Sequence, residues 1–496
     1  AIPELMRIFV DEEDLEWEEA WSITTRVFAY TNHTVLPEAL ERWSVDLMGR
    51  LLPRHLEIIY QVNDLFLESV KEQFPNDSDL LRRISFIEEN DHKQIRMPYL
   101  SIVGSHTING VAELHTELLK TTVFKDFYKL FPERFQNKTN GITPRLWLRN
   151  VNPELSKIIT AKIGDGWITE LQQLRQLEAF ADDPEFQQSW RSVKRLKKVQ
   201  LANWLKQNSG ISIDPESLFD VQIKRIHEYK RQLLNILQVI YLYNQMLEHP
   251  ELPFVSRTFL FGGKAAPGYY MAKLIINLAN DVARVVNHDP AMQDRLKVVF
   301  VPNYNVSVAE KMIPATDISQ HISTAGTEAS GTGNMKFILN GALILGTMDG
   351  ANIEIAEEVG SENIFTFGMS SDEVSSLAKS GYNPRVSYQH NPGLREALSM
   401  INTGYFNRDK PHLYNDLYNS LVFEDKYMLL EDFASYVECQ QRVIKTWQDP
   451  EIWTRMSILN TAASGKFSSD RTIAEYARDI WKLKPVTVEL PGKKVR

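Results

Sequence analysis

Apolar residues recur at helical spacing through the first hundred positions of the chain. The segment 51–67, Leu-Leu-Pro-Arg-His-Leu-Glu-Ile-Ile-Tyr-Gln-Val-Asn-Asp-Leu-Phe-Leu, places them three or four residues apart, as on one face of a helix. Glycine weakens helices, and residues 1–103 contain only one, Gly49. We therefore predict that this region is mostly helical, with a break at the polar segment 76–79 and a turn at 104–106.

Short apolar runs alternate with helical periodicity from about residue 215. Five runs predict β-strands, and the segments between them predict helices. This alternation is typical of an α/β protein with a parallel, doubly wound sheet. Helical periodicity returns from about Asn415, and the tail 485–496 is predicted to be irregular. The predicted strands are 218–223, 257–261, 296–301, 343–347 and 363–367, and the predicted helices are 229–247, 269–286 and a segment after Val306.

The composition is that of an ordinary globular protein and disfavours several classes of function. Of the 496 residues, 43% are hydrophobic and 24% are charged. A total of 55 Lys and Arg against 64 Asp and Glu gives a net charge of −9, which disfavours binding to nucleic acid. Cys439 is the only cysteine, so the chain can form neither an intrachain disulfide nor a cysteine-based zinc site. We expect a cytoplasmic protein without a metal.

No feature of the sequence indicates a membrane. Apolar runs stay shorter than the roughly 18–20 residues that span a bilayer. The first residues lead into the acidic segment 11–14 instead of the basic start of a signal peptide. We therefore expect no membrane partner and no secretion signal.

The segment Glu328-Ala-Ser-Gly-Thr-Gly-Asn-Met-Lys336 has the composition of an anion-binding loop. Its two glycines and two hydroxyl residues would let backbone N–H groups converge on an anion, with Lys336 on the first turn of the following helix. The spacing matches neither the P-loop nor G-x-G-x-x-G, because Lys336 follows the second glycine by three residues. A phosphate cradle beside a half-buried amine suits a phosphorylated aldehyde cofactor, with Lys336 as its Schiff-base partner. The alternative is a tight turn without a ligand.

Three further segments could contact ligands, and each has a structural alternative. Residues 224–231 carry five basic groups after a predicted strand, so they could bind two phosphates or form a solvated helix start. The glycine turn 262–270 could bring a ligand close to the backbone or be a packed turn. His106 could contact a sugar or phosphate, but a lone histidine is more often structural. No two carboxylates near the loop have the spacing of the two-carboxylate glycosidase mechanism.

Several of these segments together resemble the α-glucan phosphorylases, the family of the glycogen, starch and maltodextrin phosphorylases. The likeness extends from Ala1 to about Leu483 and keeps the motifs in order. Two further motifs agree, Tyr-Thr-Asn-His-Thr-Val-Leu-Pro-Glu-Ala-Leu-Glu-Arg-Trp at 30–43 and Asn-Lys-Thr-Asn-Gly-Ile-Thr-Pro-Arg at 137–145. The other segments that carry the resemblance are 224–231, 263–269, 328–336, 340–343, 346–354 and 467–471.

The resemblance implies two Rossmann-like domains that face a cleft, the GT-B arrangement, with pyridoxal 5′-phosphate bound to Lys336. It also implies phosphorolysis of terminal α-1,4-glucosidic bonds by inorganic phosphate, with release of α-D-glucose 1-phosphate and retention of configuration. The cofactor phosphate would relay the proton, which agrees with the missing carboxylate pair. Two phosphates held close together need surrounding cations, which the basic segment would supply. The expected partners are an α-1,4-glucan, inorganic phosphate or glucose 1-phosphate, and a second copy of the chain in a homodimer.

The resemblance also assigns roles to individual residues. The expected catalytic residues are Lys336, Arg225, Lys230 and Lys224. The other expected contacts are Lys224, Thr332 and Gly333 with the cofactor phosphate, Tyr304 and Asn334 at the cofactor pocket, Arg225 and Lys230 with the substrate phosphate, Glu328, Ser330 and Gly331 with the glucosyl hydroxyls, and His106 and Asn152 near the 6-position of the sugar.

One departure from the family affects the expected domains. Family members carry an N-terminal glycine-rich loop near both phosphates, and residues 1–103 do not contain it. We therefore expect the chain to begin inside the first Rossmann-like domain, past its strands. The expected domains are 1–150 as its helical remainder, 151–465 as the cofactor-binding domain, and 466–496 as a helix and tail that return to the first domain. Two other functions stay open: a catalytically silent glucan-binding protein, and a GT-B transferase that uses a nucleotide sugar.

Overall fold

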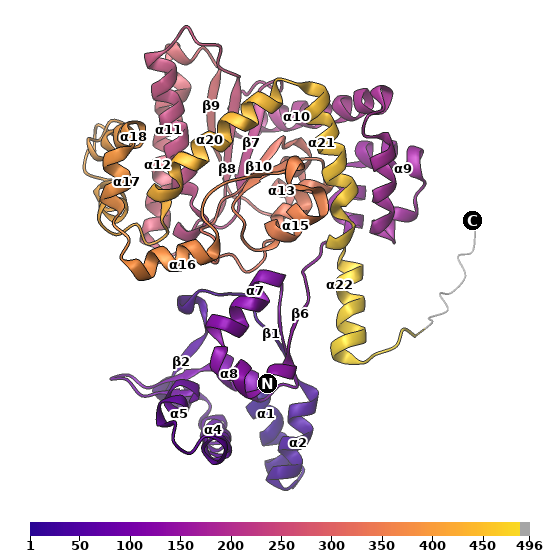
Figure 1. The fold of residues 1–496 in the computed structure, drawn as a ribbon, viewed down its shortest axis with the longest axis vertical. Helices are drawn as coiled ribbons and strands as arrows, with labels where there is room; N and C mark the ends of the chain where they lie inside the picture. Colours follow the sequence, from indigo (N-terminus) through magenta and orange to yellow (C-terminus); the bar gives the residue numbers. More distant parts are fainter. Residues whose placement is uncertain (487–496) are drawn as a thin grey trace. The chain divides into compact units, whose positions relative to one another are not determined.

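The computed structural model describes residues 1–486 and divides into two compact units (Figure 1). The first unit comprises 1–111, 119–139 and the described residues from Ser469 on, and the second comprises 112–118 and 140–468. The sequence predicted boundaries at 150 and 465 instead. The difference arises because Trp147, Leu148 and Phe467 pack in a core of the second unit. Of the predicted irregular tail 485–496, residues 487–496 lie outside the described part.

A six-stranded sheet forms the centre of the second unit, and all its paired strands are parallel. Its strands are β7 (Leu218–Ile223), β8 (Arg257–Gly262), β9 (Leu296–Val301), β10 (Ile318–His321), β11 (Leu343–Gly346) and β12 (Phe365–Thr366). Their order in space is β12-β11-β10-β7-β8-β9. Within this sheet, the chain first forms β7 in the middle and then adds β8 and β9 on one side. It then adds β10, β11 and β12 on the other side. A mixed α/β fold with parallel sheets, as predicted, is confirmed.

Strand β10 lies in the middle of this sheet, but the sequence did not predict it. Its residues after Ile318 are polar, whereas apolar runs were the signal for strands. Their burial is possible because each side chain has a hydrogen-bond partner. Ser319 Oγ lies 2.7 Å from His321 Nε2. The Gln320 amide donates to the Asp220 carboxylate at 2.9 and 3.0 Å and accepts from the Tyr436 hydroxyl at 3.1 Å.

Helices connect the strands of the second unit. Their bounds are α7 (Glu113–Leu118), α9 (Pro153–Ile163), α10 (Pro184–Ser209), α11 (Gln232–Glu248), α12 (Tyr270–His288), α13 (Val306–Ala315), α14 (Gly333–Leu339), α15 (Ala351–Val359), α16 (Ser371–Ser380), α17 (Pro384–His390), α18 (Pro392–Asn402), α19 (Asn415–Asn419), α20 (Leu429–Trp447) and α21 (Pro450–Ala462). Local sequence explains their formation. In α12, Leu274, Leu278 and Val282 recur every four residues and are buried on one face. Asp183 caps the start of α10, and Gly210 ends it with a φ of +68°.

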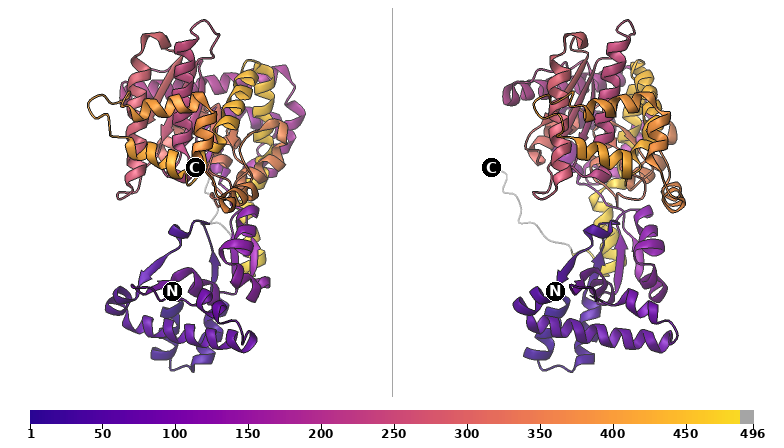
Figure 2. Two further views of the ribbon diagram at one scale, coloured as in Figure 1. Left: turned by 60° about the vertical axis from the view of Figure 1, so that its left-hand side comes forward. Right: turned by 90° about the vertical axis from the view of Figure 1, so that its left-hand side faces the viewer.

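These helices cover both faces of the sheet, and alternate strand residues point into two separate cores. One core packs α11, α12, α18 and α20 against Phe259 and Phe261. The other packs α9, α10, α13, α14 and α15 against Phe219, Val221 and Leu260. The alternation follows from the two-residue period of a strand. Helix α18 packs against α11, as the views in Figure 2 show.

The first unit combines helices with two small sheets. One sheet is parallel with the order β1-β5-β6, and the other is antiparallel with the order β2-β4-β3. The strands are β1 (Ala29–Thr31), β2 (Arg42–Ser44), β3 (Ile87–Glu88), β4 (Gln94–Arg96), β5 (Thr107–Gly110) and β6 (Phe135–Asn137). The helices are α1 (Ile2–Arg7), α2 (Trp17–Val27), α3 (Val45–Leu51), α4 (Pro53–Gln73), α5 (Ser78–Ile84), α6 (Met97–Val103), α8 (Lys125–Leu130) and α22 (Ser469–Glu475).

The prediction that residues 1–103 are mostly helical is confirmed, because helices α1 to α6 occupy most of this range. The sequence did not predict the short strands that also lie there. Strands β1 to β4 lie within that range. They are two or three residues long, so they are too short to show the alternation that identifies a strand in a sequence. The region 1–150 is therefore a mixed helix and sheet structure.

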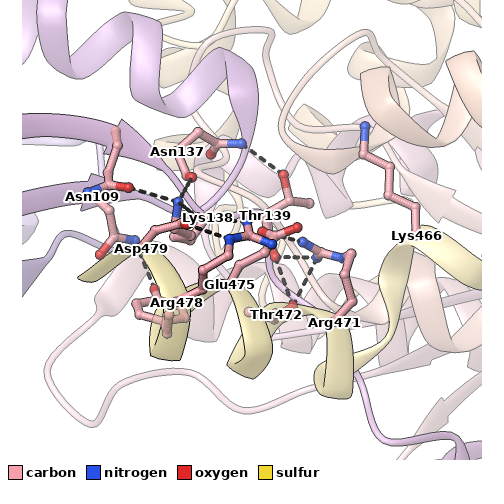
Figure 3. Close-up of polar contacts among 12 residues, drawn as sticks. Asn109, Asn137, Lys138, Thr139, Lys466, Arg471, Thr472, Glu475, Arg478 and Asp479 are labelled. Carbon is pink, nitrogen blue, oxygen red and sulfur yellow. Dashed lines mark hydrogen bonds and ion pairs between the residues drawn. The ribbon is translucent and has the colours of Figure 1, made fainter. Parts of the chain in front are cut away.

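Polar contacts hold the C-terminal helical segment within the first unit (Figure 3). The ammonium of Lys138 is buried and lies 3.1 Å from the Asp479 carboxylate. The carbonyl oxygen of Thr139 accepts hydrogen bonds from Arg471 at 2.6 Å and from Thr472 at 3.0 Å. These contacts explain why the segment from Ser469 on belongs to the unit that the chain left at residue 139.

In residues 1–486, no helix combines the length and the apolar character that crossing a membrane would require. The same residues contain no group of three or more His, Cys, Asp or Glu side chains arranged to hold a metal ion.

Candidate active site

Lys224 and His321 lie together at the carboxyl ends of the neighbouring strands β7 and β10. The order of the strands reverses between these two, and open parallel sheets bind ligands at such a point. Lys224 follows β7 directly, and its Nζ lies 3.3 Å from Nδ1 of His321, the last residue of β10. Burial and the charge of Lys230 lower the pKa of the Lys224 ammonium to about 8. An anion beside this ammonium would therefore stabilise its charged form.

The buried carboxylate of Asp349 shapes the glycine-rich loop. It accepts hydrogen bonds from the backbone N–H groups of Gly326 and Glu328, both at 2.9 Å, and from the hydroxyl of Ser323 at 2.8 Å. Burial raises the pKa of Asp349 to about 6. The Asp349 side chain thus holds Ser323, Gly326 and Glu328, which all precede Gly331 and Gly333 of the loop.

Glu328 and Lys230 form an ion pair at the start of the loop. The hydroxyl of Tyr229 lies 3.5 Å from Glu328 Oε1, and the Lys230 ammonium lies 4.5 Å from the centroid of the Tyr229 ring. Burial raises the pKa of Glu328, but the charges of Lys230 and Lys224 outweigh this effect and hold the pKa below its usual value. Glu328 is therefore a carboxylate at neutral pH, with two cations near it.

Lys336 lies on the short helix α14, with its ammonium 4.3 Å from the centroid of the Trp147 ring. Among residues 1–486, burial is the only influence on the pKa of this ammonium, and neither a hydrogen bond nor a nearby charge contributes. Burial lowers the pKa of Lys336. Burial without an anionic partner favours the neutral amine, which is the nucleophilic form of lysine.

The turn into α14 places backbone next to His321. Gly333 is the first residue of the helix, and a Cβ there would lie 3.5 Å from Cε1 of His321. The first N–H groups of a helix have no acceptor within it. Gly331 has a φ of +76°, and a Cβ on Gly350 would lie 2.6 Å from the carbonyl oxygen of Ser330. The tight turn therefore depends on glycine at 331 and 350.

The basic segment 224–231 divides into residues with different surroundings. Arg225 is exposed. Arg231 is buried, has a φ of +53°, and donates to the carbonyl of Ile322 at 2.6 Å and to Asp432 at 2.7 Å. Arg231 thus supports the backbone before the loop. Of the basic residues in this segment, Arg231 therefore does not contribute its charge to the candidate site.

Gly263 and Tyr304 lie near the ends of β7 and β8. A Cβ on Gly263 would lie 2.0 Å from the carbonyl oxygen of Lys224, so only glycine allows the two backbones to approach in this way. A Cβ on Gly262 would lie 3.6 Å from Cδ2 of Tyr304, which places this ring against the strand end. Burial raises the pKa of Tyr304 to about 12.

The remaining predicted loop residues lie around the turn into α14. Ser330 is buried, and its hydroxyl donates to the carbonyl of Gly331 at 3.2 Å. Thr332 precedes the helix as its N-cap residue, without a side-chain cap hydrogen bond. The Asn334 amide donates to Asn352 at 3.0 Å. Asn334 therefore points into the protein and braces the helix.

Asn152 and His106 lie outside this group of contacts. Asn152 caps α9 by accepting from the N–H of Leu155 at 3.4 Å, and its amide donates to Asn340 at 3.1 Å. Both polar groups of Asn152 are engaged within the protein. His106 belongs to the first unit, where its Nδ1 lies 2.8 Å from Thr107 Oγ1. The contacts predicted for both residues with a sugar stay predictions.

Sequence reasoning missed His321 and Trp147 and gave Asp349 no role. His321 ends a strand that the polar sequence concealed. Trp147 reaches Lys336 only through the folding of distant segments, so no local signal could identify it. Asp349 lies in the segment 346–354, which carries part of the resemblance. That membership was the only signal in the sequence that could have indicated a role for Asp349.

A parallel sheet that gathers cations and a partly buried amine at its carboxyl ends has the features of an enzyme site for an anionic ligand. The family model described as carbohydrate phosphorylase matches residues 1–483. The chain is 56% identical over 490 residues to a glycogen phosphorylase of Synechocystis sp.. It is 55% identical over 492 residues to the muscle form of glycogen phosphorylase from Bos taurus, and 54% identical over 490 residues to the liver form from the same organism.

Each alignment covers 99% of this chain and 58% of the relative, so the chain spans less than two thirds of the length of these relatives. The chain belongs to the carbohydrate phosphorylase family.

Proposed function

We propose that this chain forms the cofactor and phosphate sites of an α-1,4-glucan phosphorylase that uses pyridoxal 5′-phosphate. The proposed reaction is phosphorolysis of terminal α-1,4-glucosidic bonds of glycogen, starch or maltodextrin. It releases α-D-glucose 1-phosphate with retention of configuration. The observation that carries the proposal is the partly buried amine of Lys336, on whose pKa only burial acts among residues 1–486. It follows a glycine-rich loop whose Glu328 carboxylate lies near Lys224 and Lys230.

The residues at this site fit pyridoxal 5′-phosphate. Lys336 would attach the aldehyde, because burial favours its neutral amine. Lys224 and the N–H groups of Thr332 and Gly333 would bind the phosphate group. When bound, the cofactor supplies a phosphate that exchanges a proton with the substrate phosphate. We assign the lining of the same pocket to Asn334 and Tyr304, which the resemblance places there.

Arg225 and Lys230 are the proposed ligands of the substrate phosphate. The guanidinium of Arg225 is exposed and can bind two phosphate oxygens, whereas Lys230 provides a point charge. A phosphate dianion would compete with Glu328 for the Lys230 ammonium. Two phosphates held close together repel each other, and Lys224, Arg225 and Lys230 provide three positive charges to offset that repulsion.

Sugar binding is assigned to the loop. Glu328, Ser330 and Gly331 would contact the glucosyl hydroxyls, and the hydrogen bonds of Asp349 would hold Glu328 in place. His106 and Asn152 would lie near the 6-position. For Asn152 this role requires the exchange of one of its present hydrogen bonds for one to the sugar.

The proposed function extends to the fold and the assembly. The strand order of the second unit, with β7 as the first strand, is 3-2-1-4-5-6, the order of a Rossmann fold. We propose that this unit is one of two doubly wound domains in a GT-B arrangement. Glucan and phosphate are the proposed substrates, and a homodimer in the cytoplasm, without nucleic acid or membrane partners, is the proposed assembly.

The test is an incubation of the protein that contains this chain with glycogen, inorganic phosphate and pyridoxal 5′-phosphate. ³¹P NMR should show α-D-glucose 1-phosphate, and omission of either phosphate or cofactor should abolish it. The variant Arg395→Ala, on the exposed surface of α18, should be fully active. Glucose transfer that requires a nucleotide sugar and no phosphate would overturn the proposal and support a nucleotide-sugar transferase. Glucan binding without turnover would support a catalytically silent protein.

A further inference from the structure

The ring of His321 lies between Lys224 and the start of α14. Its Nδ1 is 3.3 Å from the Lys224 ammonium, and its Nε2 is 2.7 Å from the hydroxyl oxygen of Ser319. The ring also makes an edge contact with Phe337 of α14 at 5.8 Å between centroids. A Cβ on Gly333 would lie 3.5 Å from the same ring. One imidazole therefore contacts both the cation after β7 and Phe337 of the helix that carries Lys336.

The contacts determine the tautomer of His321. A lysine ammonium can only donate hydrogen bonds, so Nδ1 must accept and carries no proton. The proton then lies on Nε2 and is donated to Ser319 Oγ. Burial and the charges of Lys224 and Lys230 lower the pKa of His321 well below 6.5, so the ring stays neutral at physiological pH. The ring is thus a fixed, uncharged acceptor for Lys224.

A neutral acceptor has a different effect on its lysine than a carboxylate has. The ammonium of Lys230 is paired with Glu328, which cancels most of its charge locally. Lys224 is held by an imidazole, which orients the ammonium and leaves its full charge for an anion. The other charged groups that act on Lys224 are Lys230, Glu328 and Asp349, and Lys230 has the largest effect among them.

We propose that His321 is a positioning residue that holds the Lys224 ammonium in place for the phosphate group of pyridoxal 5′-phosphate, with Ser319 fixing the ring. This inference rests on the proposed function of the site and adds a residue that the resemblance did not assign. The role requires one acceptor atom toward Lys224 and one donor toward Ser319. Histidine in this tautomer supplies both, and so does the amide of glutamine.

Binding of two related probes tests the proposal. Pyridoxal 5′-phosphate and pyridoxal share the aldehyde, and only the first carries the phosphate group. His321→Phe keeps a ring of similar shape but removes the acceptor. We expect it to weaken binding of pyridoxal 5′-phosphate about 10-fold or more, the loss typical of a hydrogen bond to a charged group. Binding of pyridoxal should change less than about 2-fold, because this probe does not use the phosphate site.

Three further variants separate positioning from a structural effect. His321→Gln should restore binding of pyridoxal 5′-phosphate to within about 3-fold of the wild type, since the amide offers both polar groups. Ser319→Ala should give a smaller loss in the same direction as His321→Phe. His390→Phe, on the exposed surface of α17, is the matched control and should change neither affinity. The ³¹P chemical shift of the bound cofactor should differ from the wild type in His321→Phe and agree with it in His321→Gln.

Each contrary outcome has a distinct meaning. Unchanged binding of pyridoxal 5′-phosphate by His321→Phe would overturn this inference and leave the proposed function intact. Equal weakening of both probes, without rescue by glutamine, would show that His321 only packs, and would overturn the inference as well. A wild-type protein that binds neither probe at Lys336 would overturn both the inference and the proposed function.

Discussion

The carboxylate of Asp349 accepts a hydrogen bond from the backbone N–H of Glu328 at 2.9 Å. This contact joins the turn between β11 and α15 to the start of the glycine-rich loop. The side chain of Glu328 forms an ion pair with Lys230. The buried carboxylate of Asp349 therefore controls the position of the Glu328 carboxylate and, through it, of the Lys230 ammonium. The loop is therefore ordered by charge and hydrogen bonds before any ligand binds.

The pH dependence of stability should reveal the burial of Asp349. The folded pKa of about 6 lies above the ordinary value of 3.8. The stability that protonated Asp349 contributes is therefore complete below about pH 4 and is lost as pH rises through 6. Urea unfolding from pH 4 to 8 should show the wild type losing about 3 kcal/mol relative to Asp349→Asn. Asp409→Asn, at an exposed position, should follow the wild type; parallel curves for wild type and Asp349→Asn would contradict the burial argument.

The close approach of Gly263 to Lys224 gives a prediction about packing. A Cβ at 263 would lie 2.0 Å from the carbonyl oxygen of Lys224, and both partners belong to strand ends that cannot easily move. Gly263→Ala should therefore lower the free energy of unfolding by about 3 kcal/mol. Gly268→Ala is the matched control, since its Cβ would meet nothing within 4 Å, and should change stability by less than about 0.5 kcal/mol. Equal stabilities for the two variants would be evidence against this geometry.

Arg225 is exposed, and we expect it to bind the substrate phosphate. Arg225→Ala should raise the apparent KM for inorganic phosphate roughly 10-fold and change the KM for glucan much less. Steady-state kinetics with each substrate varied in turn measures both values. Arg395→Ala serves as the control for loss of an exposed arginine charge. Equal increases in the two KM values would argue against a phosphate ligand.

Lys224 should make phosphate binding depend on pH. Its ammonium has a pKa of about 8 in the cofactor-free protein, lowered by burial and Lys230, so the charge is present below pH 8 and lost above it. The ratio of the affinities for pyridoxal 5′-phosphate and pyridoxal should therefore fall as pH rises from 7 to 10. In Lys224→Arg the guanidinium keeps its charge, and the ratio should stay nearly constant. A wild-type ratio without pH dependence would show that Lys224 does not bind the phosphate group.

The apolar pattern predicted most of the parallel sheet of the second unit. The runs at 218–223 and 296–301 became β7 and β9 with the predicted bounds, because their side chains enter the two cores. Strand β10 could not be predicted, since its Gln320 is buried through hydrogen bonds to Asp220 and Tyr436 that only the folded chain provides. Likewise, no local signal showed the short strands of the first unit.

The composition of the loop and of the basic segment indicated an anion site, but not how its charges are arranged. Arg231 belongs to the basic segment in the sequence, and in the structure its left-handed backbone turns its side chain into the protein. Glu328 and Lys230 pair across nearly one hundred positions of the chain. His321 and Lys224 meet because β10 and β7 are neighbours in the sheet. Such contacts follow from sheet topology, which a single sequence does not specify.

The most direct test of the account is the attachment of the cofactor to Lys336. The protein is incubated with pyridoxal 5′-phosphate, reduced with borohydride and digested, and the peptides are mapped by mass spectrometry. We predict a phosphopyridoxyl group on the peptide that contains Lys336 and none on the peptide of the exposed Lys264. An unmodified Lys336, or modification spread over exposed lysines, would contradict the central claim.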